Sequence, residues 1–197
     1  VYIIIAFFFI YSVFIISYQY DGHHVGLVYS NALDLINGRY PYKEIFIQYG
    51  FLTTLIHGLI LILFDNKVIF LSIFTNIFYS LSILIIYQSI KNTLNNLYAF
   101  IAILIILFNH PIPWLPWSNY IAFFFLSLSI FFLTKNNKNY YLIGLFLGLI
   151  TLSRQDYFIP LLLSGVFFFL FYFFKFKKIS FNKSLNLIIG FSSPLII

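Results

Sequence analysis

The chain has 197 residues, of which 62% are hydrophobic and 8% are charged, and its mean hydropathy is +0.98. Soluble globular domains carry about 25% charged residues, so this composition excludes an ordinary soluble domain. The net charge is +6, but the lysines fall between apolar runs and form no basic groove with base-reading side chains, so nucleic acid is not an expected partner. The absence of cysteine excludes disulfides and thiol chemistry.

Apolar runs recur along the whole chain, and most of them approach the length that crosses a bilayer. They occupy residues 1–18, 50–64, 68–90, 97–109, 118–134, 140–153, 157–174 and 185–197. A spanning segment must satisfy its backbone polar groups internally, as a helix does. We therefore predict an all-α protein, a polytopic transmembrane helical bundle in which residues 1–197 form a single transmembrane domain. Because the sequence lacks an initial methionine and ends within an apolar run, we expect it to be the N-terminal part of a longer module.

The first apolar run ends in the polar stretch "SYQYDGHHVGLVYS" at residues 17–30. Residues 21–38 predict an amphipathic helix, because Asp21 is a favoured N-cap, Gly38 a favoured end, and apolar residues recur between them at helical spacing. Asp21 has two compatible interpretations, a helix cap and a catalytic carboxylate at the membrane surface. His24 lies three residues further on and can meet Asp21 on one face of the helix. His23 points about 100° away from His24 on a helix, which argues against a metal site shared by the two.

The short apolar segment at 50–64 decides the sidedness of everything that follows it. It provides fewer than the roughly 20 residues that a spanning helix needs, and it carries His57, an ionisable residue and hence a candidate substrate contact. We predict that residues 21–64 form an outer loop whose two short elements, at 21–38 and about 44–64, lie in the membrane interface. The positive-inside rule then places Lys91, Lys135, Lys138 and the basic 175–183 cluster in the cytoplasm, and the loops at 21–48, 109–117 and 153–156 together outside.

The break "SRQDY" after residue 152 holds Arg154 and Asp156. One interpretation is a tight turn in which Arg154 pairs with Asp156. The other is an anion site, because an arginine fork at the bilayer surface suits a lipid phosphate. Arg39 and Lys43 are further candidates on the same predicted face. The proline-rich stretch "NHPIPWLPWSNY" at 109–120 predicts a non-helical crossing anchored by tryptophans at the interface.

The order of these features resembles the GT-C superfamily of membrane glycosyltransferases, which includes protein O-mannosyltransferases and the lipid A aminoarabinose transferase. The resemblance lies in an acid that opens the first outer loop ("YQYDGHH"), then in "ALDLINGRYPYKEIFIQYGFLTTLIHGLILILF", and later in "LIGLFLGLITLSRQDY". These stretches are similar to the superfamily's A-x-x-l-x-x-G-x-x-P-Y segment with its Tyr-Gly continuation, and to its G-l-x-x-G-L-x-x-l-(K/R) element.

The resemblance implies a glycosyltransferase that takes a sugar from a polyprenyl-phosphate carrier and passes it to an acceptor hydroxyl on the outer face of a cell membrane, here a bacterial inner membrane. Asp21 would act on that hydroxyl and Arg154 would contact the phosphate. His24, Arg39, Lys43, His57 and Asp156 are expected to bind substrate. Membrane lipid is a further partner, and the acceptor is not specified.

Two departures from the superfamily argue against a bound metal. Many relatives carry a second acid beside the first, where this chain has Gly22 and His23, and some carry an acid in a later outer loop, where Asn119 is the nearest residue here. No cofactor is therefore expected, with a divalent metal as the open alternative. The alternative functions are a transporter or flippase, or a polymerase, of lipid-linked sugars.

Overall fold

The computed structural model describes residues 1–16, 18, 21–109, 115–176 and 181–196, and within them the regular structure is helical, with one isolated bridge between Pro41 and Ile45. The elements are α1 (Tyr2–Ile16), α2 (Gly22–Ile36), α3 (Phe51–Leu63), α4 (Ile69–Thr93), α5 (Asn96–Asn109), α6 (Ser118–Thr134), α7 (Tyr140–Ser153), η1 (Gln155–Tyr157), α8 (Phe158–Phe176), α9 (Phe181–Ser192) and η2 (Ser193–Ile196). The predicted all-α class is confirmed. Of the crossing predicted at 109–120, residues 110–114 lie outside the described residues.

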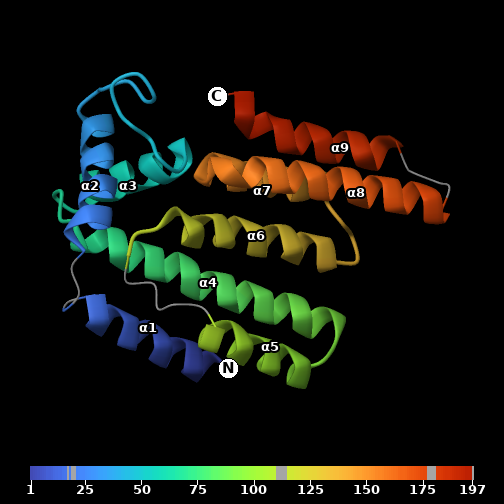
Figure 1. Ribbon diagram of the computed structural model, residues 1–197. Helices are drawn as coiled ribbons and strands as arrows, with labels where there is room; N and C mark the ends of the chain where they lie inside the picture. Colours follow the sequence, from blue (N-terminus) through green and yellow to red (C-terminus); the bar gives the residue numbers. More distant parts are fainter. Residues whose placement is uncertain (17, 19–20, 110–114, 177–180, 197) are drawn as a thin grey trace.

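The helices α1, α4, α5, α6, α7, α8 and α9 run roughly along one direction, and α2 stands across them at one end of the molecule (Figure 1). The pairs α1–α4, α4–α5, α4–α6, α6–α7 and α7–α9 pack against one another. The short helix α3 lies at the same end as α2 and contacts α2, α4 and α7. We call this end, formed by residues 21–64 together with 115–118 and 152–157, the polar end of the bundle.

In the described part of the chain, α4 is the helix long and apolar enough to cross a membrane, with 25 residues. Shorter apolar helices of 13 to 17 residues are α1, α3, α5, α6 and α7. Membrane association is thus indicated by one helix, α4.

The long helices pack through small and polar residues rather than through large apolar ones alone. On α4 the buried side chains include Thr75, Asn76 and Ser82, and on α6 they include Ser127 and Ser129. The hydroxyls of Thr75, Ser82 and Ser127 donate back to carbonyl oxygens of their own helices, as Ser82 does to Phe78 at 2.7 Å, and that of Ser129 donates to the carbonyl oxygen of Ile143 on α7. These hydroxyls are therefore buried without loss of a hydrogen bond. Small residues let two helix backbones approach closely.

The closest approach joins α7 and α9. A Cβ atom added to Gly144 would lie 2.1 Å from the carbonyl oxygen of Leu187, and one added to Gly190 would lie 2.1 Å from that of Tyr141. Gly148, four residues after Gly144, meets the α9 backbone in the same way. The glycines of the predicted "G-l-x-x-G" element therefore have a packing role in this structure.

The amphipathic helix expected at 21–38 is confirmed as α2, with Asp21 as its N-cap and Gly38 just beyond its end at φ +84°. Its apolar face packs on α3 and α4 through Val28 and Ala32. The second short element was expected from about residue 44, but its helix begins only at Phe51. Residues 40–45 instead form a tight turn in which Tyr42 has φ +62°, a conformation that stops a helix.

Candidate functional site

Asp21 holds the first turn of α2 with both carboxylate oxygens. Oδ1 accepts hydrogen bonds from the backbone N–H groups of His23 and His24 at 3.0 and 3.1 Å, and Oδ2 lies 2.6 Å from Nδ1 of His24. The hydrogen bond from the His24 side chain is the main reason that the pKa of the Asp21 carboxyl is lowered from its ordinary value of 3.8. The expected meeting of Asp21 and His24 is confirmed, and so is the capping role of Asp21.

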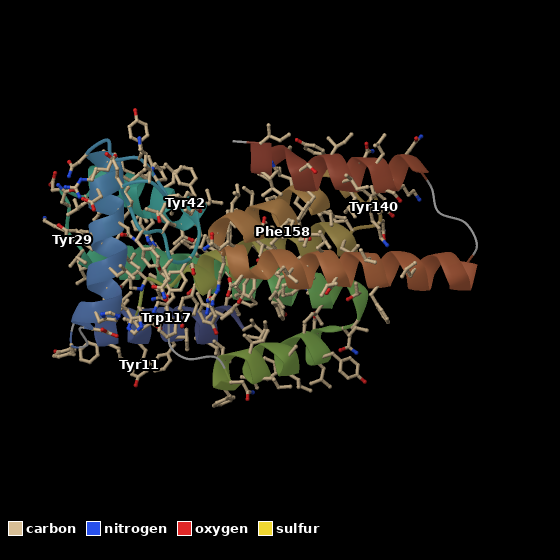
Figure 2. The ribbon with its side chains drawn as sticks, turned by 45° about the horizontal axis from the view of Figure 1, so that its top comes forward. Tyr11, Tyr29, Tyr42, Trp117, Tyr140 and Phe158 are labelled. Atoms are coloured by element: carbon tan, nitrogen blue, oxygen red, sulfur yellow. The ribbon has the colours of Figure 1, made fainter. Side chains whose placement is uncertain are left out.

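Trp117 brings the start of α6 to this pair. Its ring meets the His24 imidazole edge-on, with 5.9 Å between ring centroids. The indole Nε1 of Trp117 and the hydroxyl of Ser118 are buried and have no hydrogen-bond partner among the described residues. Buried polar atoms without partners are uncommon in folded proteins and mark a place where water or a ligand can bind. Figure 2 shows Trp117, Tyr29 and Tyr42 at one end of the molecule and Tyr140 at the other.

Hydrogen bonds join the start of α3 to the end of α7. Thr53 Oγ1 donates to the carbonyl oxygen of Ser153 at 2.8 Å, and the backbone N–H of Gln155 donates to the carbonyl oxygen of Tyr49 at 3.1 Å. Gly50 lies between these bonds, and a Cβ atom there would be 2.3 Å from the carbonyl oxygen of Leu152. The contact therefore needs glycine at position 50. It holds the segment at 48–50, where the first loop leads into α3, beside the "SRQDY" break.

Arg154 lies at this junction and is three-quarters covered, with 22% of its side chain exposed. Its Nε and Nη2 donate to the two carboxylate oxygens of Asp156 at 2.8 Å, which confirms the predicted pairing. The guanidinium also lies over the rings of Tyr49 and Tyr157, 5.5 and 5.2 Å from their centroids. The hydrogen bonds to Asp156 raise the pKa of Arg154, so the residue carries its charge at any working pH.

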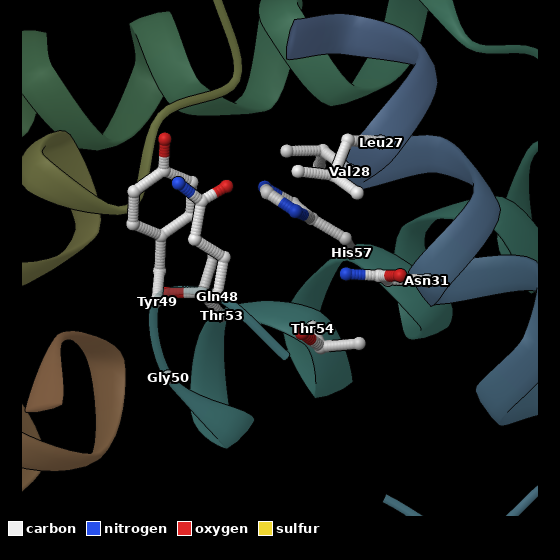
Figure 3. A pocket seen from close by; sticks show the side chains of 9 residues that line it. All are labelled: Leu27, Val28, Asn31, Gln48, Tyr49, Gly50, Thr53, Thr54 and His57. Atoms are coloured by element: carbon white, nitrogen blue, oxygen red, sulfur yellow. The ribbon is translucent and has the colours of Figure 1, made fainter. Parts of the chain in front are cut away.

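A small pocket lies between α2, α3 and the segment at 48–50, with room for about one water molecule. Its wall is formed by Leu27, Val28, Asn31, Gln48, Tyr49, Gly50, Thr53, Thr54 and His57. In Figure 3 the His57 ring points into the space between α2 and Gln48 with Tyr49. Both His57 ring nitrogens are buried without a hydrogen-bond partner among the described residues, and burial lowers the pKa of His57 to about 3. The pocket thus contains a neutral imidazole that can both donate and accept a hydrogen bond.

The pocket links the two predicted groups. The pocket is lined on the α2 side by Leu27, Val28 and Asn31, and His24 precedes the first two by three and four residues. Residues at this spacing share one face of a helix, so the Asp21–His24 pair lies one turn from the pocket along the same face of α2. On the other side, Tyr49 both lines the pocket and contacts the Arg154 guanidinium. The structure therefore brings Asp21, His24, His57, Arg154 and Asp156 to the polar end of the bundle.

Arg39 and Lys43 also belong to the polar end, but they lie away from the Asp21–His24 pair. Arg39 follows the C-terminal end of α2, about 22 Å of helix away from Asp21, and forms an ion pair with Asp34 at 3.0 Å. Lys43 is exposed and lies 5.8 Å above the ring of Tyr40. Both were expected among the substrate contacts, and both lie at the far end of α2 from the Asp21–His24 pair.

Sequence reasoning missed Tyr49 and Trp117 as members of the site. Tyr49 belongs to the quoted Tyr-Gly segment, but its contact with Arg154 depends on the packing of α3 against α7. Trp117 was interpreted as an interfacial anchor, and its contact with His24 depends on where α6 begins. No local pattern in the sequence reports either contact, since each joins segments about 90 to 105 residues apart.

Comparisons with protein-family models, with curated proteins and with solved structures give no match. The likeness to GT-C glycosyltransferases is thus carried by the sequence motifs alone. Within the part of the chain that the structure describes, no three His, Cys, Asp or Glu side chains lie together as a metal site would require.

Proposed function

We propose that the protein is a multi-pass glycosyltransferase of a cell membrane that transfers a sugar from a polyprenyl-phosphate carrier to an acceptor hydroxyl at the outer face. The observation that carries the proposal is the fastening of the first loop to the α7–α8 break, through Thr53 and Ser153, which brings the Asp21 and Arg154 segments to one end of the bundle. A lipid phosphate lies at headgroup depth, so a reaction on it needs its acid–base group and its cation at the same end.

A membrane location is supported by the sides of the bundle. Large apolar side chains point outward from several parallel helices, for example Ile3 on α1, Phe108 on α5 and Phe167 on α8, each at least 74% exposed. Exposed apolar surface of this extent is unfavourable in water and favourable in lipid. Lys91 lies in the last turn of α4, and Lys135 and Lys138 lie in the α6–α7 turn, at the end opposite α2 (Figure 1). By the positive-inside rule, the polar end would then face outward.

The Arg154 guanidinium and the Asp21–His24 pair suit the two charge changes that sugar transfer from a lipid phosphate requires. Departure of the carrier phosphate leaves negative charge on oxygen, which the Arg154 guanidinium can offset, and Nη1 of Arg154 has no hydrogen-bond partner among the described residues. The acceptor hydroxyl must lose its proton as the new bond forms, and the Asp21–His24 pair provides acid–base groups for that step.

The test is the Asp21→Asn variant of the full-length protein in proteoliposomes, with release of sugar from polyprenyl-phosphate sugars as the readout. Asparagine caps a helix as well as aspartate does, so α2 is retained. We expect sugar release to fall by about 100-fold or more. Asp34→Asn is the matched control, because Asp34 is an acid at the other end of the same helix, and its activity should stay within about threefold of the wild type. Equal activity of the Asp21→Asn variant and the wild type would contradict the proposal.

A further inference from the structure

The Asp21 carboxylate is poorly suited to take a proton directly. Three hydrogen bonds converge on its two oxygens, from the backbone N–H groups of His23 and His24 and from the His24 ring. Each bond uses a lone pair and stabilises the ionised form, which weakens the carboxylate as a base. A group that is already the cap of a helix also cannot swing toward a substrate without breaking the cap.

His24 has the complementary properties. Its Nδ1 lies 2.6 Å from Asp21 Oδ2, and an ionised carboxylate at that distance accepts a proton-bearing Nδ1. The lone pair of the neutral ring is then on Nε2, which has no hydrogen bond to any described residue. The side chain is 41% exposed, so a substrate hydroxyl can reach it, while the edge contact with Trp117 restricts the rotation of the ring. Among the described residues, the titratable groups that face it are Asp21 and His23, whose ring centroid is 5.1 Å away.

The adjoining pocket gives an independent sign of a ligand. His57, one turn further along the α2 face and across from it on α3, is 1% exposed and has two ring nitrogens without partners among the described residues. A neutral imidazole of this kind pairs with a hydroxyl group, which can both donate and accept. A hydroxyl-bearing molecule with one group in the pocket would therefore lie beside His24.

From this geometry we propose that His24 is the general base of the transfer and that Asp21 is the positioning residue that fixes the tautomer and orientation of its ring. The inference rests on the proposed function. In the step, the acceptor oxygen forms a bond to the anomeric carbon of the sugar, and the bond from that carbon to the carrier phosphate breaks, with its electron pair leaving on the phosphate oxygen. The acceptor proton passes to Nε2 of His24 and is later released to water, which restores the neutral ring.

Two variants separate catalysis from structure at this residue. His24→Asn keeps an amide near the position of Nδ1, and so a donor to Asp21, but lacks Nε2. His24→Ala removes the ring and leaves space for added imidazole. We expect each variant of the full-length protein in proteoliposomes to lose about 100-fold or more in sugar release. Imidazole should restore part of the activity of His24→Ala, in a saturable way, and should not restore that of His24→Asn.

The control for the base is Asp21→Ser, which retains a capping oxygen, assayed with added formate. Formate can accept the same hydrogen bond from Nδ1 of His24, so we expect it to restore part of the activity of Asp21→Ser and none of the activity of the double variant Asp21→Ser/His24→Asn. His23→Ala should stay within about threefold of the wild type. Each variant is first compared with the wild type by circular dichroism in detergent.

Several outcomes would overturn the inference while the wild type remains active: full activity of His24→Asn, a folded His24→Ala that imidazole does not restore, or restoration of Asp21→Ser/His24→Asn by formate. A wild-type protein that releases no sugar from any polyprenyl-phosphate sugar would instead contradict the proposed function, and the inference with it.

Discussion

The hydroxyl of Thr53 donates a 2.8 Å hydrogen bond to the carbonyl oxygen of Ser153, a residue 100 positions further along the chain. Both residues are buried, so the bond is shielded from water and its loss would leave an unsatisfied carbonyl at the end of α7. This bond and the neighbouring Gln155–Tyr49 backbone bond hold the start of α3 against the break that carries Arg154. The proposed site depends on this junction more than on any single polar residue.

Gly50→Ala should disrupt the junction. The added methyl group would lie 2.3 Å from the carbonyl oxygen of Leu152, and the surrounding atoms are backbone, which cannot move aside cheaply. We expect a loss of about 1–3 kcal/mol in the free energy of unfolding, measured by thermal or denaturant unfolding in detergent. Gly26→Ala is the control: nothing lies within 4 Å of its new methyl group, and alanine stabilises a helix interior by about 1 kcal/mol. Equal stabilities of the two variants would contradict the packing described here.

Gly144→Ala should weaken the contact between α7 and α9. The new Cβ atom would lie 2.1 Å from the carbonyl oxygen of Leu187, so the two helices must separate. We expect a lower melting temperature than that of the wild type. Gly165→Ala, on α8 with open space around the glycine, should melt no lower than the wild type. If the two substitutions had the same effect, the close approach of α7 and α9 would be wrong.

Arg154 should govern affinity for the phosphate of the donor. Arg154→Lys keeps a charge but loses the planar fork, and we expect the KM for a polyprenyl-phosphate sugar to rise by about tenfold or more. Asp156→Asn should have the opposite effect and lower this KM, because it removes the carboxylate that occupies Nε and Nη2. An unchanged KM in both variants would show that the guanidinium does not contact the donor.

The Asp21 carboxyl should titrate below its ordinary pKa of 3.8, chiefly because His24 donates a hydrogen bond to the ionised form. Its folded pKa is lower than its unfolded pKa, so the stabilising contribution is complete above the unfolded value and is lost as the pH falls through the folded value. Carbon-13 NMR of the labelled carboxyl can follow the titration in detergent. In His24→Ala the midpoint should move up toward 3.8, and the same midpoint as in the wild type would show that the pair is not formed.

The sequence predicted the helical class, the helix α2 and the pairing of Arg154 with Asp156, but it placed the start of α3 too early. Apolar periodicity and the capping signals placed α2 within two residues at its C-terminal end. The shortness of the segment at 50–64 led to the prediction that it lies in the membrane interface as part of an outer loop, and this stays a prediction. In the structure, α3 begins beside Ser153 at the end of α7 and ends just before α4 begins. These features follow from local spacing and length, which a sequence displays directly.

Other features depend on contacts between distant segments. His57 is buried because α2 and the segment at 48–50 cover α3. The residue spacing within α3 alone does not predict which segments surround this side chain. The glycines of α7 matched a family element in the sequence, yet their close neighbours are α9 backbone atoms. Arg39 shared the predicted face with Asp21, but its distance from Asp21 follows from the full length of α2. Fifteen helical residues separate the two.

The most direct test of the account is the side of the membrane on which the first loop and the α7–α8 break lie. The chain has no cysteine, so single cysteines can be placed at exposed positions, Tyr42 in the first loop, Gln155 in the break and Asn137 in the α6–α7 turn. Gln155 is preferred to the neighbouring Ser153, because Ser153 is buried and a cysteine there would not react. With an impermeant maleimide on intact cells, cysteines at 42 and 155 should react and one at 137 should react only after permeabilisation. Reaction of 42 and 155 from opposite sides would contradict a shared site at the polar end.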